Sequence, residues 1–236
     1  MSFRADARDP RAPRRELARL GPVEQLRAGR LTRRLTQLVF GLVLYGLTIA
    51  MLIRSTLGNA PWDVLHQGLA EHLPIDIGGA LIIVSGLVLL LWIPLRELPG
   101  LGTIANAILI GVSTDVFLSL LAAPDALAAR VGLVVGGVGL NGIATALYIG
   151  SQLGPGPRDG LMTGLHRRTG VSIRLVRTLM EVTVVAIGFV LGGTVGFGTL
   201  LYALAIGPMV QLFLPYAIVE LPGAAPVDVE EAAEAA

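Results

Sequence analysis

The chain has 236 residues, of which 53% are hydrophobic and only 15% are charged, with a mean hydropathy of +0.72 and a formal net charge of +1. This composition excludes an ordinary soluble domain and indicates an integral membrane protein. The absence of cysteine excludes disulfides and cysteine-based metal or redox chemistry. All 18 basic residues are arginine, which codon usage in a GC-rich genome explains better than a need for guanidinium groups.

Residues 1–34 contain ten arginines and too few apolar residues to form a core. We expect a mostly disordered cytoplasmic arm, or one that lies on the membrane surface. Positive charge before an apolar segment is explained by membrane topology, or by contact with anionic lipid, more simply than by nucleic-acid binding. We therefore expect no nucleic-acid partner, and we expect no signal-peptide cleavage because no small-residue site follows the first apolar segment.

Six apolar segments follow the arm, and each is long enough to cross about 30 Å of hydrocarbon as a helix. They comprise residues 35–55, 77–95, 101–121, 131–152, 173–194 and 197–219. Two shorter segments, 61–73 and 157–169, carry charged residues and histidines and would be only about 20 Å long as helices. We expect these two to be re-entrant or interfacial helices.

The chain contains an internal duplication with an offset of 96 residues. LGNAPWDVLHQGL at 57–69 recurs as LGPGPRDGLMTGL at 153–165, and GLGT at 100–103 recurs as GFGT at 196–199. Superposing 41–117 on 137–213 without a gap gives 23 identities in 77 positions, where composition alone gives about a tenth. Each copy holds three apolar segments, and an odd number of spans inverts the second copy, as in many secondary transporters.

Charge bias predicts the orientation of this all-α membrane protein. With the amino terminus inside, 16 arginines are cytoplasmic, and only Arg54 and Arg130 are external. We therefore expect a multi-pass protein of the bacterial plasma membrane with both termini in the cytoplasm. Its predicted parts are an arginine-rich arm (1–34), repeat 1 (35–123), an inverted repeat 2 (124–219) and an acidic cytoplasmic tail (220–236).

Each copy of the repeated motif places a glycine at the end of one helix, a proline at the first position of the next, and an aspartate in its first turn. These residues are Gly58, Pro61 and Asp63 in the first copy, and Gly154, Pro157 and Asp159 in the second. Helix capping explains all six, because a carboxylate in the first turn complements the helix dipole. The alternative is that inversion brings two helix starts together at mid-membrane as a substrate or ion site. The sequence leaves both interpretations open.

The Gly-x-Gly-Thr pairs favour a tight turn followed by a helix that Thr103 or Thr199 caps. Exposed amides at these helix starts are the alternative, as an anion site. A nucleotide-binding motif is improbable, because neither copy follows a strand.

Asp115 lies well inside the third apolar segment, and its counterpart is Gln211, so the duplication does not explain it. An intramembrane carboxylate usually faces a cavity or a partner, which makes Asp115 a candidate proton or cation site. Asn106 is a candidate for the same cavity, although amides more commonly join helices. For Glu181 we favour an ion pair with Arg177, one helical turn away.

No catalytic motif is present, since the chain has no HExxH, Gly-x-Ser-x-Gly or P-loop pattern. The three histidines have spacings that suit no common pair of metal ligands. We therefore expect neither an enzyme nor a cofactor or metal site.

The motif LGNAPWDVL at 57–65, with GLGTIAN at 100–106 and Asp115 four positions after Gly111, resembles the YczE/YyaS/YitT family of bacterial integral membrane proteins, most closely its YczE branch. The resemblance covers about residues 35–215, and Arg158 replaces the motif's tryptophan in the second copy. It implies a multi-span inner-membrane protein. Members are described as candidate transporters or as affecting secondary-metabolite production.

We therefore predict a secondary transporter, with export as one option, of a small polar or amphipathic molecule. Asp63 and Asp159 would order two helix ends around the substrate, and Asp115 would couple transport to protons or a cation. The alternative is a membrane scaffold or regulator that binds protein partners, through its arginine-rich arm, without a transport cycle. An intramembrane enzyme has no motif to support it.

Overall fold

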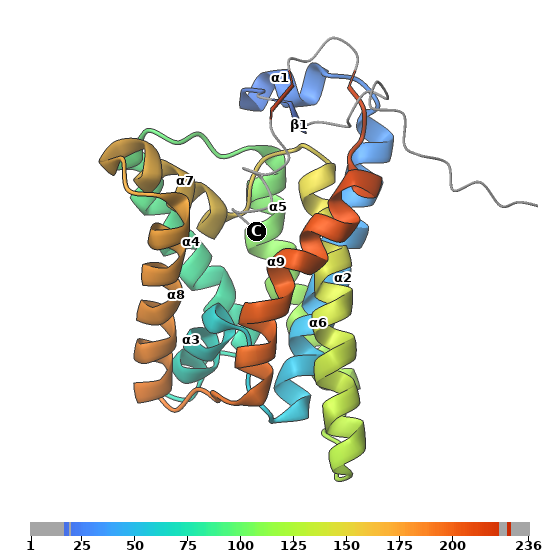
Figure 1. The fold of residues 1–236 in the computed structure, drawn as a ribbon, viewed down its shortest axis with the longest axis vertical. Coiled ribbons are helices and arrows are strands. Elements are labelled where there is room, and N and C mark those ends of the chain that lie inside the picture. The colour runs from blue at the N-terminus through green and yellow to red at the C-terminus, as the bar shows by residue number, and fades with distance from the viewer. Residues whose placement is uncertain (1–16, 19, 222–225, 228–236) are drawn as a thin grey trace, which may run out of the picture.

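The computed structural model describes residues 17–18, 20–221 and 226–227 (Figure 1). In chain order the elements are β1 (Leu17–Ala18), α1 (Pro22–Arg27), α2 (Leu31–Ser55), α3 (Pro61–Ala70), α4 (Ile77–Leu95), α5 (Leu101–Leu120), α6 (Leu127–Gly150), α7 (Pro157–Thr169), α8 (Ile173–Val190), α9 (Phe197–Ala217) and β2 (Pro226–Val227). The strands form one antiparallel pair, with Leu17 opposite Val227. The rest of the described chain is helices and connecting loops, as expected.

The predicted arm and tail are only partly described. Within the arm, residues 22–27 form α1, and α2 begins at Leu31, so the end of the arm is helical. Most of the arm's arginines lie outside the described residues, as do Asp228, Glu230, Glu231 and Glu234 of the tail.

Five of the described helices (α2, α4, α5, α6 and α9) are long and apolar enough to cross a membrane. Large apolar side chains such as Phe40, Leu91, Leu120 and Leu204 are exposed on these helices. Such surfaces are unfavourable in water and are expected against lipid. The chain is therefore a multi-pass membrane protein.

The sixth predicted span corresponds to α8, which has 18 residues and carries Arg174, Arg177 and Glu181. Charged residues within a span are costly, and α8 is not among the five clear spans. Arg177 and Glu181 form the expected pair, with Nε and Oε1 3.0 Å apart. The sixth span remains a prediction.

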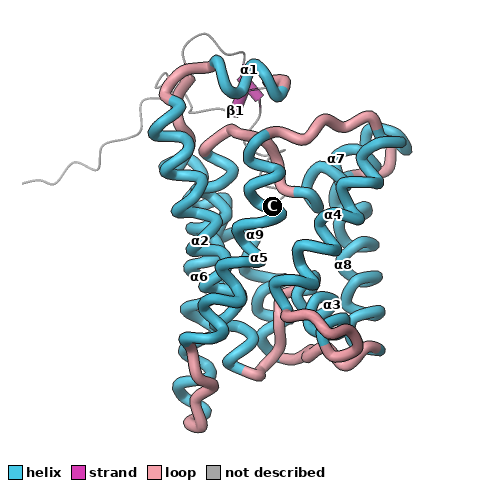
Figure 2. The backbone as a smooth tube through the Cα atoms, turned by 180° about the vertical axis from the view of Figure 1, so that it is seen from behind, coloured by secondary structure: helices cyan, strands magenta, loops and turns pink. Residues whose placement is uncertain are grey.

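Helices α2 and α6 pack along each other at one side of the molecule, with α5 on α2 and α9 on α6 (Figures 1 and 2). Arg34, near the start of α2, donates from Nε to the Ser151 carbonyl after the end of α6, at 2.7 Å. Arg130, near the start of α6, donates from Nε to the Ser55 carbonyl at the end of α2, also at 2.7 Å. The two helices therefore run antiparallel, and each arginine caps the helix of the other half.

The two Leu-Gly turns dock against the Gly-x-Gly-Thr segments of the opposite halves. The amide of Gly198 donates to the Leu57 carbonyl at 2.8 Å, and the amide of Gly102 donates to the Leu153 carbonyl at 2.6 Å. A Cβ on Gly102 would lie 2.8 Å from that carbonyl oxygen, so the close approach requires glycine there. The two motifs have the same spacing in both copies, and in each case they contact the opposite copy.

The threonines of these segments lie where the capping interpretation expects them. The Thr103 hydroxyl accepts from the Gly100 amide at 3.1 Å, and the Thr199 hydroxyl accepts from the Gly196 amide at 3.2 Å. Gly58 and Gly154 both adopt φ +117°, a conformation that L side chains rarely adopt. Thr103 and Thr199 thus lie at the starts of α5 and α9, whereas Gly58 and Gly154 shape the turns that precede α3 and α7.

The short helices α3 and α7 lie toward opposite ends of the molecule (Figures 1 and 2). Helix α3 packs on α8, and α7 packs on α4. The indole of Trp92 on α4 donates to the Pro157 carbonyl at 2.9 Å, and its ring occupies the space that a side chain at Gly160 would fill. Each short helix is therefore held by a long helix of the other half, and its first residues face the middle of the molecule.

Candidate functional site

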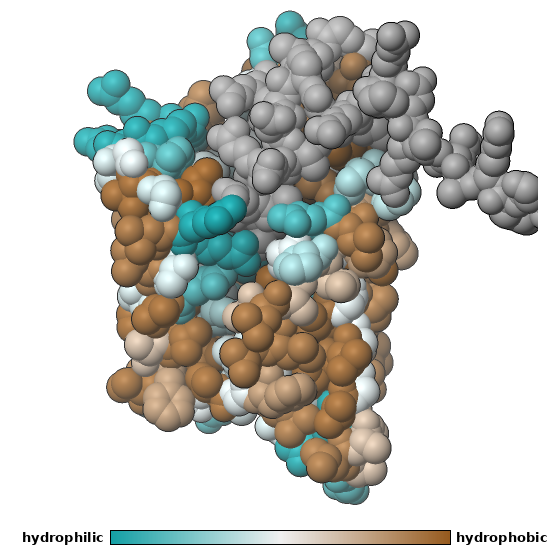
Figure 3. Space-filling model, in the orientation of Figure 1, coloured by the Kyte–Doolittle hydropathy of each residue, from teal (hydrophilic) through white to brown (hydrophobic). Residues whose placement is uncertain are grey.

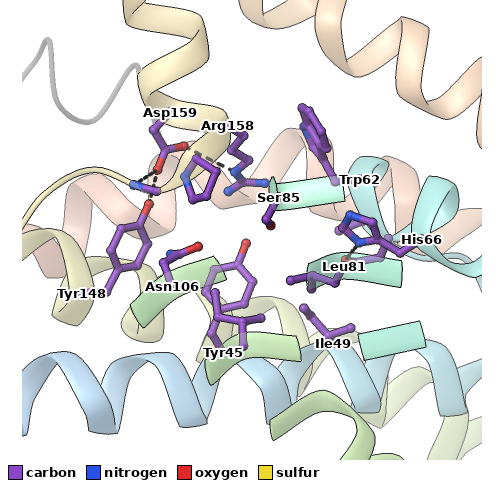
Figure 4. A pocket seen from close by; sticks show the side chains of 15 residues that line it. Tyr45, Ile49, Trp62, His66, Leu81, Ser85, Asn106, Tyr148, Arg158 and Asp159 are labelled. Atoms are coloured by element: carbon purple, nitrogen blue, oxygen red, sulfur yellow. Dashed lines mark hydrogen bonds and ion pairs between the residues drawn. The ribbon is translucent and has the colours of Figure 1, made fainter. Parts of the chain in front are cut away.

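A cavity of about 60 Å³ lies where the starts of α3 and α7 approach each other (Figure 4). Helices α2, α4, α5 and α6 complete its wall through Tyr45, Ile49, Leu81, Ser85, Asn106, Ile110 and Tyr148. This volume accommodates roughly four water molecules. It also fits the headgroup of a larger molecule, but it is far below the roughly 300 Å³ typical of a pocket that encloses a drug-sized ligand.

Asp159, on α7, is both a cap and a cavity residue. Its carboxylate accepts from the Gly156 amide at 3.2 Å, which satisfies the start of α7, and it also accepts from the Tyr148 hydroxyl. Its other oxygen lies 3.4 Å from Nε of Arg158. Asp159 therefore caps the start of α7 and also lies on the cavity wall.

Asp63, on α3, has different partners. Its Oδ1 lies 3.2 Å from Nδ1 of His66, one turn along the same helix, and both residues are buried. Asp63 lies in the first turn of α3, where a carboxylate complements the helix dipole, but no side chain makes a cap hydrogen bond at the start of this helix. The two side chains therefore form a buried polar pair one helical turn apart.

Arg158 brings a positive charge to the centre of the cavity. Its Nε pairs with Asp159, whereas its two terminal nitrogens have no hydrogen-bond partner among the described residues. Figure 4 shows the guanidinium between the starts of α3 and α7, with the Tyr45 hydroxyl and Ser85 facing it. A guanidinium with free terminal N–H groups can bind a carboxylate or phosphate through two parallel hydrogen bonds.

Asn106 lines the cavity from α5, as expected. Its amide group also has no hydrogen-bond partner among the described residues, and it lies beside Tyr148 in Figure 4. Polar side chains also join α2, α6 and α9. The Tyr45 and Tyr202 hydroxyls are 3.3 Å apart, and Tyr202 donates to Asn141 at 3.0 Å. The cavity is therefore polar on several sides.

Other predicted site residues lie outside the cavity. Gly58, Gly154, Thr103 and Thr199 make the turn and capping contacts described above, and Pro61 begins α3 without reaching the cavity wall. Pro157 is on the wall.

Asp115 is also separate from the cavity in which we expected it. Its Oδ1 accepts from the Gly78 amide at 2.7 Å, at the start of α4. This hydrogen bond satisfies an amide that has no partner within its own helix, which accounts for a carboxylate at that position.

The cavity wall also includes residues that were not predicted from the sequence, namely His66, Arg158, Trp62, Tyr45 and Ser85. Three of them had a usable signal, because Trp62 and Arg158 precede the two repeated aspartates and His66 follows Asp63 by one helical turn. Tyr45 and Ser85 come from other helices and had none.

Among the described residues, no group of three histidine, cysteine, aspartate or glutamate side chains could hold a metal ion.

The family described as "Family of unknown function (DUF6198)" matches residues 32–215, which include nearly all of α2 through α9. This chain belongs to the DUF6198 family. The match spans both copies of the repeated motif and every residue of the cavity wall.

Similar proteins include an uncharacterized protein of Haemophilus influenzae, 44% identical over 75% of this chain and 81% of that protein. The uncharacterized membrane protein YczE of Bacillus subtilis is 33% identical over 75% of this chain and 84% of its own length. The uncharacterized protein YyaS of the same organism is 27% identical over 74% and 89%. No solved structure matches the chain. The resemblance to the YczE and YyaS proteins is confirmed, and YczE is itself described as a membrane protein.

Proposed function

We propose that this DUF6198 protein is a secondary transporter of the plasma membrane, and that the cavity between α3 and α7 binds a small polar or amphipathic molecule. The observation that carries this proposal is the meeting of two short-helix starts at one polar cavity. Helix starts present unpaired amides and partial positive charge, which favour polar and anionic groups at membrane depth. Arg158 and Asn106 add donors with no partner in the described protein.

The proposal includes an inverted duplication, in which α2 to α5 and α6 to α9 are the two copies. Contacts exchanged between equivalent residues support it. Arg34 and Arg130 are 96 positions apart, as are their acceptors Ser151 and Ser55. Reciprocal contacts of this kind imply a two-fold relation, and because α2 and α6 are antiparallel, the axis would lie across the helices and in the membrane plane. In this arrangement α8 is the counterpart of α4 and the sixth span.

An inverted pair also suggests a transport cycle. The two copies would make equivalent contacts on opposite sides of the cavity, so rocking of one copy against the other would open it to either side in turn. The side with most arginines would be cytoplasmic, with both termini there.

For coupling, we propose a proton carried by the Asp63 and His66 pair in place of Asp115. Imidazole commonly gains and loses a proton between pH 5 and 8. The other ionisable groups on the same cavity wall are Arg158 and Asp159 on α7, with Tyr45 on α2 and Tyr148 on α6. A proton on His66 would thus change the charge that faces Arg158 and the bound molecule.

A comparison of metabolites inside and outside cells tests the transport proposal. Cells that produce the wild-type protein should differ from cells without it in the distribution of at least one small polar or amphipathic compound. Asp159→Asn should remove most of that difference, because it weakens both the hydrogen bond from Tyr148 and the ion pair with Arg158. Asp125→Asn, on an exposed loop, is the matched control and should leave it unchanged. The same distribution in cells with the wild-type protein and with Asp159→Asn would contradict the proposal.

A deletion of residues 1–16 distinguishes the transporter from the alternative, a regulator that acts through the arginine-rich arm. This deletion leaves α1 and its contact with Arg34 in place. A transporter should retain its effect on metabolites after this deletion. Loss of the effect with normal membrane insertion would favour action through the arm.

The proton proposal is tested with His66→Gln, which keeps a hydrogen-bonding side chain but cannot titrate near neutral pH. We expect the wild-type metabolite difference to change when the external pH is moved from 6 to 8, and the His66→Gln difference to be insensitive to that change. An unaltered pH response in His66→Gln would exclude this pair as the coupling site.

A further inference from the structure

The two copies differ in how their second and third long helices pack. In the first copy, α4 and α5 are in direct contact. Gly78 and Gly111 face each other there, and a Cβ on Gly111 would lie 2.6 Å from the Gly78 carbonyl oxygen. The hydrogen bond from the Gly78 amide to Asp115 also joins α4 to α5 at this contact. Small residues at this position let the helices approach closely.

In the second copy the equivalent positions are Arg174 and Gly207. Arg174 cannot occupy the space that Gly78 takes, and no described atom lies within 4 Å of a Cβ built on Gly207. Helix α8 packs on α3 and α7, and it makes no comparable contact with α9 in the described chain. We call the region between α8 and α9 the open seam. Figure 3 shows hydrophilic side chains in the upper part of this region, on a face that is otherwise mostly hydrophobic.

A second pocket, of about 20 Å³, lies on the α8 side and continues from the cavity. The two share Trp62, Arg158 and Asp159, while Met162, Met180 and the Arg177–Glu181 pair form the rest of the second pocket. Arg158 therefore faces both spaces. Its two uncommitted nitrogens are thus available to both the second pocket and the cavity.

We propose that the cavity is entered from the side, through the open seam, and that its occupant is an amphipathic molecule with an anionic headgroup. This inference rests on the proposed function, because it takes the cavity as the substrate site. The cavity holds a headgroup but no hydrocarbon chain of any length, so the chain must lie elsewhere. In this proposal the chain passes from the second pocket, whose wall includes Met162 and Met180, into the seam, and exposed Val182 and Leu204 lie on the helices that flank the seam.

The hydrogen-bonding groups left on the cavity wall favour an anion as the headgroup, because Asp63 is engaged by His66. Asp159 is already engaged by Tyr148, Gly156 and Arg158, and Glu181 is engaged by Arg177. The terminal nitrogens of Arg158 are the charged donors left for a ligand, and a guanidinium binds phosphate or carboxylate well. A free anion from water shares this chemistry, so the experiment must separate the two sources.

Because the chain has no cysteine, a single introduced cysteine is its only thiol. Met180→Cys places a thiol in the second pocket, and Val84→Cys places one at the equivalent position of α4, which is buried. The purified full chain in dodecyl maltoside is labelled with N-ethylmaleimide. We expect Met180→Cys to react and Val84→Cys to remain unlabelled. If Met180→Cys is not monodisperse, Met162→Cys, in the same pocket, replaces it in the labelling experiment.

Three probes then compete with labelling: dodecyl phosphate, inorganic phosphate and dodecyltrimethylammonium. Dodecyl phosphate at ten times its dissociation constant should slow labelling of Met180→Cys about tenfold, because only the free form reacts. The other two probes should have no effect. Adding Arg158→Gln should abolish the protection, whereas adding Arg167→Gln, at an exposed arginine outside both pockets, should retain it.

Several results would overturn the proposal. Equal protection by inorganic phosphate would indicate a small anion entering from water. Protection by dodecyltrimethylammonium would indicate shielding without charge recognition. An unreactive Met180→Cys in a chain that migrates as a dimer would indicate that a second copy covers the seam, and no protection by any probe would remove the site. If these results occur while Asp159→Asn still abolishes the metabolite difference, only the side entry and the anionic amphipath fail, and the transport proposal stands.

Discussion

The arginines that cap helices between the two halves show how single residues hold this protein together. Arg34 is fully buried, and its guanidinium donates to carbonyls of Ser151, Gln152 and Gln25. It thereby ties α1 and the start of α2 to the end of α6. In the sequence Arg34 is one of ten arginines in the arm, so charge counting assigns it to topology when its role is structural.

We expect Arg34→Met to lower the free energy of unfolding by about 3 kcal/mol, since it removes hydrogen bonds from a charged donor and leaves buried carbonyls without partners. Arg130→Met, at the equivalent and partly exposed position, should have a smaller effect. Thermal unfolding of the purified variants in detergent measures both. A larger loss of stability in Arg130→Met than in Arg34→Met would contradict this account.

The duplication identified the two aspartates as candidate site residues, but it did not predict the side chains that they contact. Asp63 and Asp159 hold equivalent positions, yet one pairs with His66 and the other with Tyr148 and Arg158. A repeat identifies what the copies share, whereas a binding site depends on where they differ. Tyr45 and Ser85 complete the cavity only because distant helices fold against the motif, which local patterns do not encode.

At the scale of elements, hydropathy predicted the helices better than their ends. The segment 77–95 was predicted with its observed bounds, but α2 begins at Leu31 and α6 at Leu127, four residues earlier than predicted in each case. Both early turns contain arginines that hydropathy excludes from a span, and these are the arginines that cap the other half. The short helices were predicted to start at Pro61 and Pro157, and they do, because proline suits the first position of a helix.

The difference in packing between α4–α5 and α8–α9 predicts different effects of the same substitution at two equivalent glycines. Gly111→Ala should destabilise the protein by about 1 to 3 kcal/mol, because the added methyl would collide with the α4 backbone. Gly207→Ala, the same change at the equivalent position, meets open space and should be neutral or slightly stabilising, since alanine favours helix by up to about 1 kcal/mol. Thermal unfolding midpoints of the two variants distinguish them, and equal destabilisation would mean that the α8–α9 seam is closed.

At the scale of the molecule, the proposed inversion explains why two motifs 96 residues apart face one cavity. The duplication, the odd number of apolar segments per copy and the distribution of arginines predicted this arrangement from sequence. The departure from symmetry at the open seam was not predictable in the same way. Replacement of Gly78 by Arg174 has a meaning only once the facing residue, Gly111 or Gly207, is known.

The most direct test of the inverted arrangement uses Leu73→Cys and Thr169→Cys, which are 96 positions apart, exposed, and at the ends of α3 and α7. Each variant is labelled in intact spheroplasts with a membrane-impermeant maleimide, and again after lysis. The account predicts that Leu73→Cys is labelled in intact spheroplasts, and that Thr169→Cys is labelled only after lysis. Labelling of both, or of neither, before lysis would place the two short helices on one side of the membrane and contradict the account.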